Sequence, residues 1–168
     1  SGGMTVGLKN AGFEIAMGID VDDAALAVYR SNHAHPAVNL DLGDVGAACR
    51  LIGNVDLLAG SPPCTDFSSA GSRVEGENAS LTVAFARLAV ASRARCVLLE
   101  NVCELLRSIA WVKAREVLME AGYSVIVLHI NSAACGVAQI RRRVFVIATL
   151  GCPEHALKRV RREAAGYN

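Results

Sequence analysis

Residues 55–64 read VDLLAGSPPC: a short apolar run followed by a glycine, a serine and two prolines. The run at residues 55–59 predicts a buried strand, and the prolines end it because proline has no amide hydrogen for a sheet. On both sides of this stretch, similar apolar runs alternate with helical spacing. Strands are predicted at residues 13–20, 96–99, 124–130 and 144–150, and helices at residues 22–32, 80–92 and 109–121.

This alternation predicts an α/β fold built from βαβ units around a mostly parallel sheet. In such sheets, ligands bind at the carboxyl ends of the strands. Three polar or reactive groups follow predicted strands and should therefore meet at one edge: Asp20, the turn at residues 61–64, and Glu100 with Asn101. The sequence has no repeat, low-complexity segment or linker, so we expect one domain over residues 1–168.

The composition narrows the class of protein. Hydrophobic residues make up 52% of the 168 residues and charged residues 20%, which predicts a buried core and excludes a disordered chain. The net charge of +1 does not by itself indicate nucleic acid, but seven of the 17 lysines and arginines follow Gln139. They predict either a local basic patch or, for the last four, a solvated helix face.

The six cysteines form no C-x-x-C pair and no zinc-like cluster with histidine. We therefore expect no metal site and a reduced, intracellular protein, cytoplasmic if bacterial or phage-borne. No apolar run reaches the roughly 18 residues of a membrane span, and no signal peptide is visible. The chain begins without methionine, in what looks like the middle of a glycine-rich turn, and this suggests a fragment.

Two local motifs each allow two interpretations. Gly2 and Gly3 precede a helix-like stretch and Asp20 ends the next strand, an arrangement that suits a nucleotide or, equally, a tight turn with a helix cap. Cys64 follows Pro62 and Pro63 at a strand end, where rigid backbone would present a nucleophile. The alternative is a proline-rich turn that happens to precede a cysteine.

Two further motifs lie later in the chain. Glu100 ends an apolar strand, where desolvation would help it hold a proton, although Asn101 could simply cap a helix. Arg141 and Arg143 alternate on an extended segment, so both lie on one face and could bind phosphates or carbonyl oxygens. The alternative for this segment is an edge strand protected by charge.

Taken in order, these motifs resemble the cytosine-C5 methyltransferase family. Gly2 and Gly3 look like the end of its F-x-G-x-G-G loop, and SPPCTDFS at residues 61–68 looks like its catalytic loop. Residues 100–102 look like its Glu-Asn-Val motif and residues 139–143 like its Gln-x-Arg-x-Arg motif. The resemblance covers residue 1 to about residue 150.

The resemblance implies a doubly wound, Rossmann-like methyltransferase sandwich. Its sheet would be parallel except for one antiparallel strand, at residues 144–150. The family's first strand, target-recognition region and late motifs are not found in residues 1–168, so we expect a chain truncated at both ends. A missing segment or a second chain would then supply target recognition to an enzyme that is incomplete alone.

The resemblance also implies a mechanism on double-stranded DNA with the target base flipped out of the helix. The Cys64 thiolate would add to C6 of cytosine, and a protonated Glu100 would meet N3. The C5 carbon would then take the methyl group of S-adenosylmethionine, and a base would remove the C5 proton. Arg143 would hold O2 and favour the thiolate. The supporting catalytic residues would be Arg141 near Cys64 or a phosphate, Asn101 orienting the loop, and Pro63 shaping it.

For S-adenosylmethionine, the resemblance places Gly2 and Gly3 near the methionine part. Asp20 would bind the ribose hydroxyls, with Val21 packed on the adenine. The remaining cofactor residues would be Asp41 at the adenine amino group, with Asp44 as a near alternative, Leu42 beside the ring, and Ser61.

Two other functions stay open at this stage. A tRNA-directed branch of the family shares all these motifs, so RNA is an alternative substrate. A non-catalytic subunit that binds S-adenosylmethionine is the second alternative, although the presence of Cys64, Glu100 and Arg143 argues against a decayed site. A nicotinamide-dependent dehydrogenase would leave the Pro-Pro-Cys motif and the paired arginines without a role.

Overall fold

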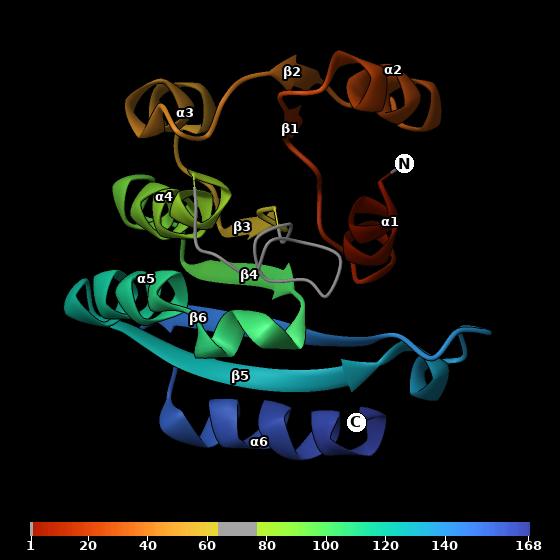
Figure 1. The fold of residues 1–168 in the computed structure, drawn as a ribbon, viewed down its shortest axis with the longest axis vertical. Helices are drawn as coiled ribbons and strands as arrows, with labels where there is room; N and C mark the ends of the chain where they lie inside the picture. The colour runs from red at the N-terminus through yellow and green to blue at the C-terminus, as the bar shows by residue number, and fades with distance from the viewer. Residues whose placement is uncertain (1, 64–76) are drawn as a thin grey trace. The chain divides into compact units, whose positions relative to one another are not determined.

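The structure is a computed structural model that describes residues 2–63 and 77–168. The chain forms two compact units, Ser1–Asp44 and Val45–Asn168 (Figure 1). The prediction of a single domain over residues 1–168 stays a prediction. Each unit alternates helices and strands, as expected from the sequence.

The first unit contains two helices and a pair of parallel strands: α1 (Gly3–Asn10), β1 (Gly18–Asp20), α2 (Asp23–Asn32) and β2 (Ala37–Asn39). Helix α2 begins at its predicted position because the Asp22 carboxylate accepts hydrogen bonds from the amides of Ala24 and Ala25. Strand β1 is shorter than predicted. The Phe13 amide bonds to the Leu8 carbonyl at 3.0 Å, so the start of the predicted strand serves to terminate α1.

The second unit contains α3 (Val45–Ile52), β3 (Leu57–Gly60), α4 (Glu77–Ala91), β4 (Cys96–Asn101), α5 (Ile109–Glu120), β5 (Tyr123–Asn131), β6 (Arg142–Leu150) and α6 (Glu154–Ala164). Short 3-10 turns occupy Cys103–Arg107, Ser132–Cys135 and Ala165–Tyr167. The strands form one sheet in the order β3-β4-β6-β5. Strand β6 runs antiparallel to both neighbours, whereas β3 and β4 are parallel, which confirms the predicted sheet.

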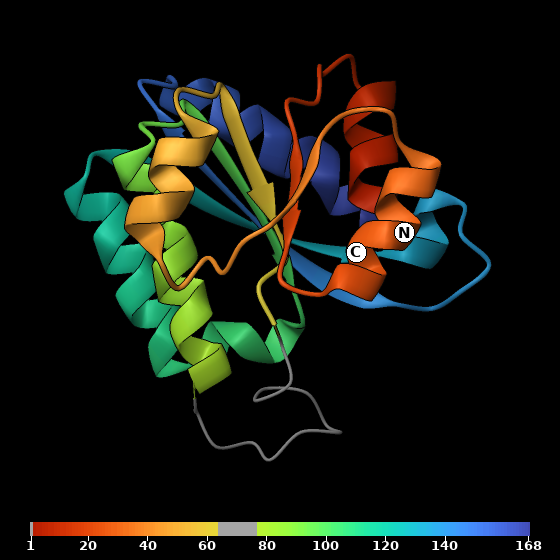
Figure 2. The ribbon, with the colours of Figure 1, turned by 90° about the horizontal axis from the view of Figure 1, so that it is seen from above.

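Helices cover both faces of this sheet (Figures 1 and 2). Helices α4 and α5 pack together on one face, with α3 beside α4, and α6 packs against β5 on the other face. Between α4, α5 and the sheet lie fully buried apolar side chains, among them Leu88, Val97 and Val146. Under α6, Leu157 packs with Ile126 and Leu128 of β5. The alternating exposure along β4 follows from the two-residue period of a strand.

Among the described residues, no helix is long and apolar enough to cross a membrane.

Candidate active site

The carboxyl ends of β3 and β4 lie side by side in the second unit. Gly60 pairs with Leu99, so Ser61 emerges next to Glu100. Gly60 permits a close approach: a Cβ there would lie 2.5 Å from Cε2 of Phe85, whose side chain is buried. The sequence predicted that these two strand ends would meet, and the structure brings them together.

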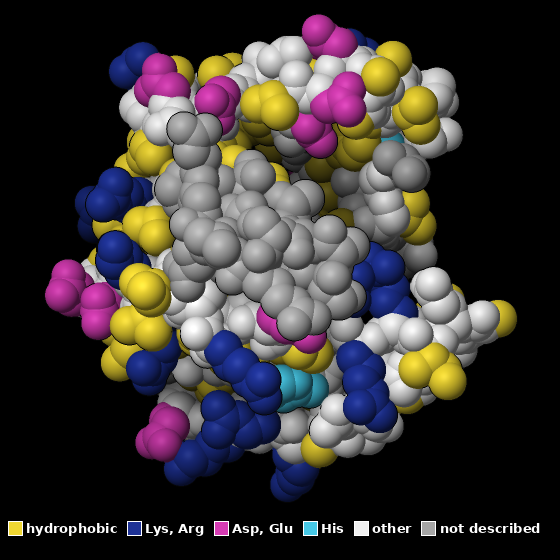
Figure 3. All heavy atoms as spheres, in the orientation of Figure 1, with side chains coloured by type: hydrophobic (Ala, Val, Ile, Leu, Met, Phe, Trp, Pro, Cys, Tyr) yellow, Lys and Arg dark blue, Asp and Glu magenta, His cyan; other side chains and the backbone are white. Residues whose placement is uncertain are grey.

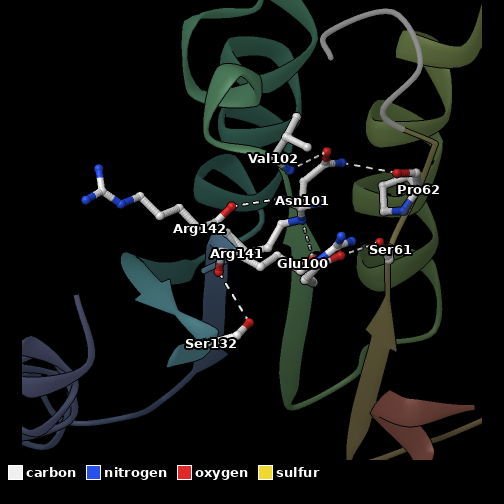
Figure 4. Close-up of polar contacts among 9 residues, drawn as sticks. Ser61, Pro62, Glu100, Asn101, Val102, Ser132, Arg141 and Arg142 are labelled. Carbon is white, nitrogen blue, oxygen red and sulfur yellow. Dashed lines mark hydrogen bonds and ion pairs between the residues drawn. The ribbon is translucent and has the colours of Figure 1, made fainter. Parts of the chain in front are cut away.

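Glu100 has a partner for each of its carboxylate oxygens (Figure 4). The Ser61 hydroxyl donates to Oε2 at 2.6 Å, and Nε of Arg143 lies 3.2 Å from Oε1. The side chains of Glu100 and Arg143 are only 19% and 22% exposed, so water screens this pair less than a surface ion pair. Three segments far apart in the sequence therefore converge on one carboxylate.

Arg143 reaches this edge because β6 is antiparallel. Its amino end, not its carboxyl end, lies beside the end of β4, where Asn101 pairs with Val144. The Arg143 guanidinium also donates from Nη1 to the Arg142 carbonyl at 2.8 Å, which fixes its direction.

Asn101 joins the two strand ends through its amide. It is 2% exposed, its Nδ2 donates to the Pro62 carbonyl at 3.1 Å, and its Oδ1 accepts from the Val102 amide at 2.8 Å. The orienting role predicted for Asn101 has this contact as its physical basis. Pro63 follows as an exposed residue, and Cys64 lies outside the described residues.

Arg141 and Arg142 are exposed at the entrance to β6. The Arg141 carbonyl accepts from the Ser132 amide at 3.0 Å, and Figure 4 shows the Arg142 side chain extending away from Glu100. Strand β6 is paired on both sides from Val144 to Thr149, whereas Arg142 and Arg143 pair with β5 alone. The alternative of an edge strand protected by charge is therefore excluded for the body of β6 and stays open for its first two residues.

Basic side chains are also spread over the surface of the second unit (Figure 3). On α6, Lys158 pairs with Glu154 at 2.9 Å and Arg159 with Glu163 at 2.8 Å, all with exposed side chains. Each pair spans one helical turn, and Lys158 lowers the pKa of Glu154 through a hydrogen bond. Lys158 and Arg159 therefore fit the solvated helix face better than a binding patch.

The predicted cofactor residues lie mostly in the first unit. Gly2 caps α1 in the left-handed region, with φ of 81°, and a Cβ on it would collide with the ring of His33. Gly3 is the first residue of α1. Asp20 ends β1 as an exposed residue, and its Oδ1 accepts from the Asp22 amide at 3.1 Å.

The segment after β2 runs beside Asp20, because the Leu40 amide bonds to the Asp20 carbonyl at 3.0 Å. Asp41 is exposed and accepts from the Gly43 amide at 2.7 Å, and Leu42 is half-buried. Val21 is 59% exposed next to these carboxylates. Carboxylates that can accept from hydroxyl or amino groups, beside an exposed apolar side chain, fit the predicted nucleoside.

Asn39 was missed by the sequence reasoning. Its Nδ2 donates to the Val21 carbonyl at 3.1 Å and to Oδ1 of Asp23 at 2.7 Å, so it holds the ends of β1 and β2 together. The available signal was an asparagine directly after the short apolar pair Ala37 and Val38, a strand that was itself not predicted.

A polar cluster in the same unit was also missed. The Tyr29 hydroxyl is 2.7 Å from Oγ1 of Thr5 and 2.6 Å from Nε2 of His35, and the ring of His33 lies 4.6 Å from that of Tyr29. Nε2 of His33 is buried without a hydrogen-bond partner. The cluster ties α1 and α2 to the segment before β2 and lies under Gly2.

Comparison with known proteins decides the family. A family model described as C-5 cytosine-specific DNA methylase matches residues 1–162. The chain belongs to this family. The chain spans about half the length of the curated relatives it matches. It is 41% identical to the Type II methyltransferase M.HgiDI of Herpetosiphon aurantiacus over 87% of this chain and 48% of that protein. It is 33% identical to M.HindV of Haemophilus influenzae over 93% of this chain and 52% of that protein.

Solved structures show the same fold at lower identity. The S. pombe Dnmt2 methyltransferase superposes with a TM-score of 0.75 at 22% identity, over 90% of this chain and 47% of that one. A putative DNA modification methyltransferase from an E. coli prophage gives a TM-score of 0.73 at 23% identity, over 93% and 44%. The C-5 cytosine methylase fold predicted from the motifs is thereby confirmed.

Within the described part of the chain, no group of three or more histidine, cysteine, aspartate or glutamate residues could hold a metal ion. The five described cysteines, which are Cys49, Cys96, Cys103, Cys135 and Cys152, are all free thiols.

Proposed function

We propose that the protein carrying this chain transfers a methyl group from S-adenosylmethionine to C5 of cytosine in double-stranded DNA. One observation supports this function above the others: Glu100 is held between Ser61 and Arg143 beside the prolines that lead to Cys64. A cysteine, an acid and a cation in the chain order Cys64, Glu100 and Arg143 suit attack on a base ring, and the family match supports DNA as the substrate.

The chemistry would begin with addition of the Cys64 thiolate to C6 of the flipped-out cytosine. Glu100 would give its proton to N3. The electron pair that the addition at C6 pushes toward N3 would then not leave a full negative charge on the ring. Arg143 would hold O2 and supply the positive potential that a cysteine needs to ionise. Arg141 would contact a phosphate or the cysteine loop, and Pro63 would contact the base.

S-adenosylmethionine would supply an electrophilic methyl group on a sulfonium centre. Within the first unit, Asp20 would accept from the ribose hydroxyls, Asp41 from the adenine amino group, and Val21 would pack on the ring. Gly2 and Gly3 would let backbone approach the methionine part. Leu42 would border the adenine.

Two alternatives are tested together with this proposal. An RNA substrate remains the first alternative, because a tRNA-directed branch of the family shares the same motifs. The likeness to the S. pombe Dnmt2 methyltransferase shows the fold alone and does not decide between the two substrates. The second is a non-catalytic subunit that binds S-adenosylmethionine. We further propose an intracellular location and a separate segment or second chain that recognises the target sequence.

The test is covalent trapping with the complete natural protein that carries this sequence. It is incubated with S-adenosylmethionine and duplex DNA containing 5-fluorocytosine, because fluorine at C5 blocks the final removal of a proton. The expected result is a denaturation-resistant complex that is lost in Cys64→Ser. Since Cys135 is exposed and far from the motif in sequence, Cys135→Ser is the matched control and should still trap DNA.

The other outcomes are equally informative. A complex with fluorinated RNA and none with DNA would replace the DNA substrate by RNA. If neither nucleic acid is trapped while S-adenosylmethionine still binds, the non-catalytic subunit becomes the better assignment.

A further inference from the structure

We propose that Ser61 is a positioning residue for Glu100, in place of the cofactor role that the sequence suggested. Its hydroxyl keeps the Glu100 carboxyl group in one place while that group gains and loses a proton. This inference rests on the proposed function, because it concerns the same site.

The geometry commits the single hydroxyl proton of Ser61 to Glu100. The distance of 2.6 Å between Oγ and Oε2 is typical of a strong hydrogen bond to a charged oxygen. The parallel pairing of β3 with β4 sets this distance, since Gly60 and Leu99 are partners one residue before the contact. A donation from Ser61 to any other ligand would require this bond to break.

The two partners of Glu100 differ in which protonation state of its carboxyl group they can hydrogen-bond. Arg143 has donors and no acceptor, so it suits an ionised carboxylate. A serine hydroxyl can donate to a carboxylate and can accept from a carboxylic acid. Ser61 is therefore the partner at this contact that fits both forms of Glu100.

The proposed reaction needs both forms. When Glu100 protonates N3, its O–H bond breaks, an N–H bond forms, and the electron pair of the O–H bond stays on the carboxylate. When Cys64 is eliminated, the N–H bond at N3 breaks and the proton returns to the carboxylate, so that neutral 5-methylcytosine is released. Rotation of the Ser61 hydroxyl from acceptor to donor would follow each change without moving the carboxyl group.

Ser61 can be changed without disturbing the core. The residue is exposed, whereas the neighbouring Pro62 is buried, so loss of the hydroxyl removes little packing. Ser61→Ala removes the hydrogen bond, and Ser61→Thr keeps a hydroxyl while adding one methyl group to an exposed residue. Comparing the two variants therefore distinguishes the effect of losing the hydroxyl from the effect of changing the packing of the loop.

The first measurement does not depend on turnover. Carbon-13 labelling of glutamate carboxyl carbons, with Glu100→Gln to assign the signal, reports the mobility of the Glu100 carboxyl group in the 168-residue chain through NMR relaxation. In Ser61→Ala the mobility of this carboxyl group should rise, because the hydrogen bond that holds it in place is lost. In Ser61→Thr it should stay near that of the unaltered chain. Identical relaxation of the Glu100 carboxyl signal in Ser61→Ala and the unaltered chain would overturn the inference.

The second measurement uses kinetics of the complete natural protein on DNA. Ser61→Ala should lower kcat about tenfold and leave KM for S-adenosylmethionine nearly unchanged. Ser61→Thr should restore most of kcat. A large rise in that KM with an unchanged kcat would instead assign Ser61 to the cofactor and refute the positioning role.

The two measurements also separate this inference from the proposed function. If the mobility of the Glu100 carboxyl group depends on the Ser61 hydroxyl and the unaltered protein methylates neither DNA nor RNA, the contact stands and the proposed function fails. If the unaltered protein methylates DNA and the mobility of this carboxyl group does not depend on Ser61, the function stands and the inference fails.

Discussion

At the residue scale, Asn101 satisfies two backbone groups with one side chain. Replacing it by alanine leaves the Pro62 carbonyl and the Val102 amide without these partners in a buried setting. We expect Asn101→Ala to lower the free energy of unfolding by about 1–3 kcal/mol. Urea denaturation followed by circular dichroism measures this. Asn54→Ala, at an exposed asparagine of the same unit, should change stability by less than about 0.5 kcal/mol, and equal losses in both variants would contradict the prediction.

His35 gives the first unit a pH dependence. Its pKa is lowered from 6.5, first by burial and then by the charges of His33 and Lys9. As pH falls through 6.5, the unfolded chain binds the proton before the folded chain does, so folding stability declines. The contribution of His35 is complete above about pH 6.5 and is lost toward acid.

We therefore expect a lower thermal midpoint at pH 5.5 than at pH 7.5, measured in matched ionic strength. His35→Asn removes the titrating group, and His33→Asn removes the second cause of the shift, so both should reduce the difference between the two pH values. A difference that is unchanged in both variants would show that other groups control it.

The alternation of strands and helices placed residues 61–64 beside Glu100 and Asn101 at one edge, and the family resemblance added Arg143 to the same site. The sequence could not assign the partner of the Ser61 hydroxyl, which depends on the register between β3 and β4. The cluster of Tyr29 with His33 and His35 was equally hidden. Its hydrogen bonds depend on how α1 and α2 pack, and spacing along the chain carries no sign of that.

At the element scale, the end of β3 is set by the contact between Gly60 and Phe85. A Cβ at residue 60 would lie 2.5 Å from the ring of Phe85, and that ring is 2% exposed and cannot move into solvent freely. We expect Gly60→Ala to cost about 1–3 kcal/mol of unfolding free energy through overpacking. Chemical denaturation tests this.

Gly7→Ala is the matched control for that substitution. Gly7 lies within α1 and a Cβ there meets nothing within 4 Å, so alanine should stabilise by up to about 1 kcal/mol through its higher helix propensity. If Gly60→Ala were as harmless as Gly7→Ala, the Phe85 contact would not constrain the strand end.

Long elements with clear periodicity were predicted within a few residues, among them α2, α5 and β6. Two elements, β2 and α3, were missed, and α6 was predicted only as one of two interpretations of the last four basic residues. Strand β2 has only three residues, which is too short for a pattern, and it depends on pairing with β1. Helix α3 has eight residues, of which Ala48 is the buried one, so its apolar pattern is short. Helix α6 carries so many charges that its one buried residue, Leu157, gave a weak apolar signal.

At the scale of the whole molecule, the predicted cofactor residues and the predicted catalytic residues fall largely in different units. Asp20 and Asp41 belong to the unit Ser1–Asp44, and Glu100 and Arg143 to the unit Val45–Asn168. Under the proposed function, cofactor affinity and catalysis should therefore respond to different substitutions.

We expect Asp20→Asn to weaken S-adenosylmethionine binding about tenfold or more, because a charge-assisted hydrogen bond to a hydroxyl is lost. Glu100→Gln should leave this affinity within about twofold and remove methyl transfer. Isothermal titration calorimetry with the complete natural protein measures the first quantity and a methylation assay the second. Equal losses of affinity in both variants would refute this division.

The pairing of β6 with a neighbour on each side has a consequence for how this gene can change. One added residue between Arg143 and Ile147 would turn every later side chain of the strand to the opposite face of the sheet. One added residue between Gly136 and Ile140 falls in a turn closed by the bond from the Ser132 amide to the Arg141 carbonyl, ahead of the paired residues. Codon insertions should therefore survive selection in the turn and be eliminated a few positions later.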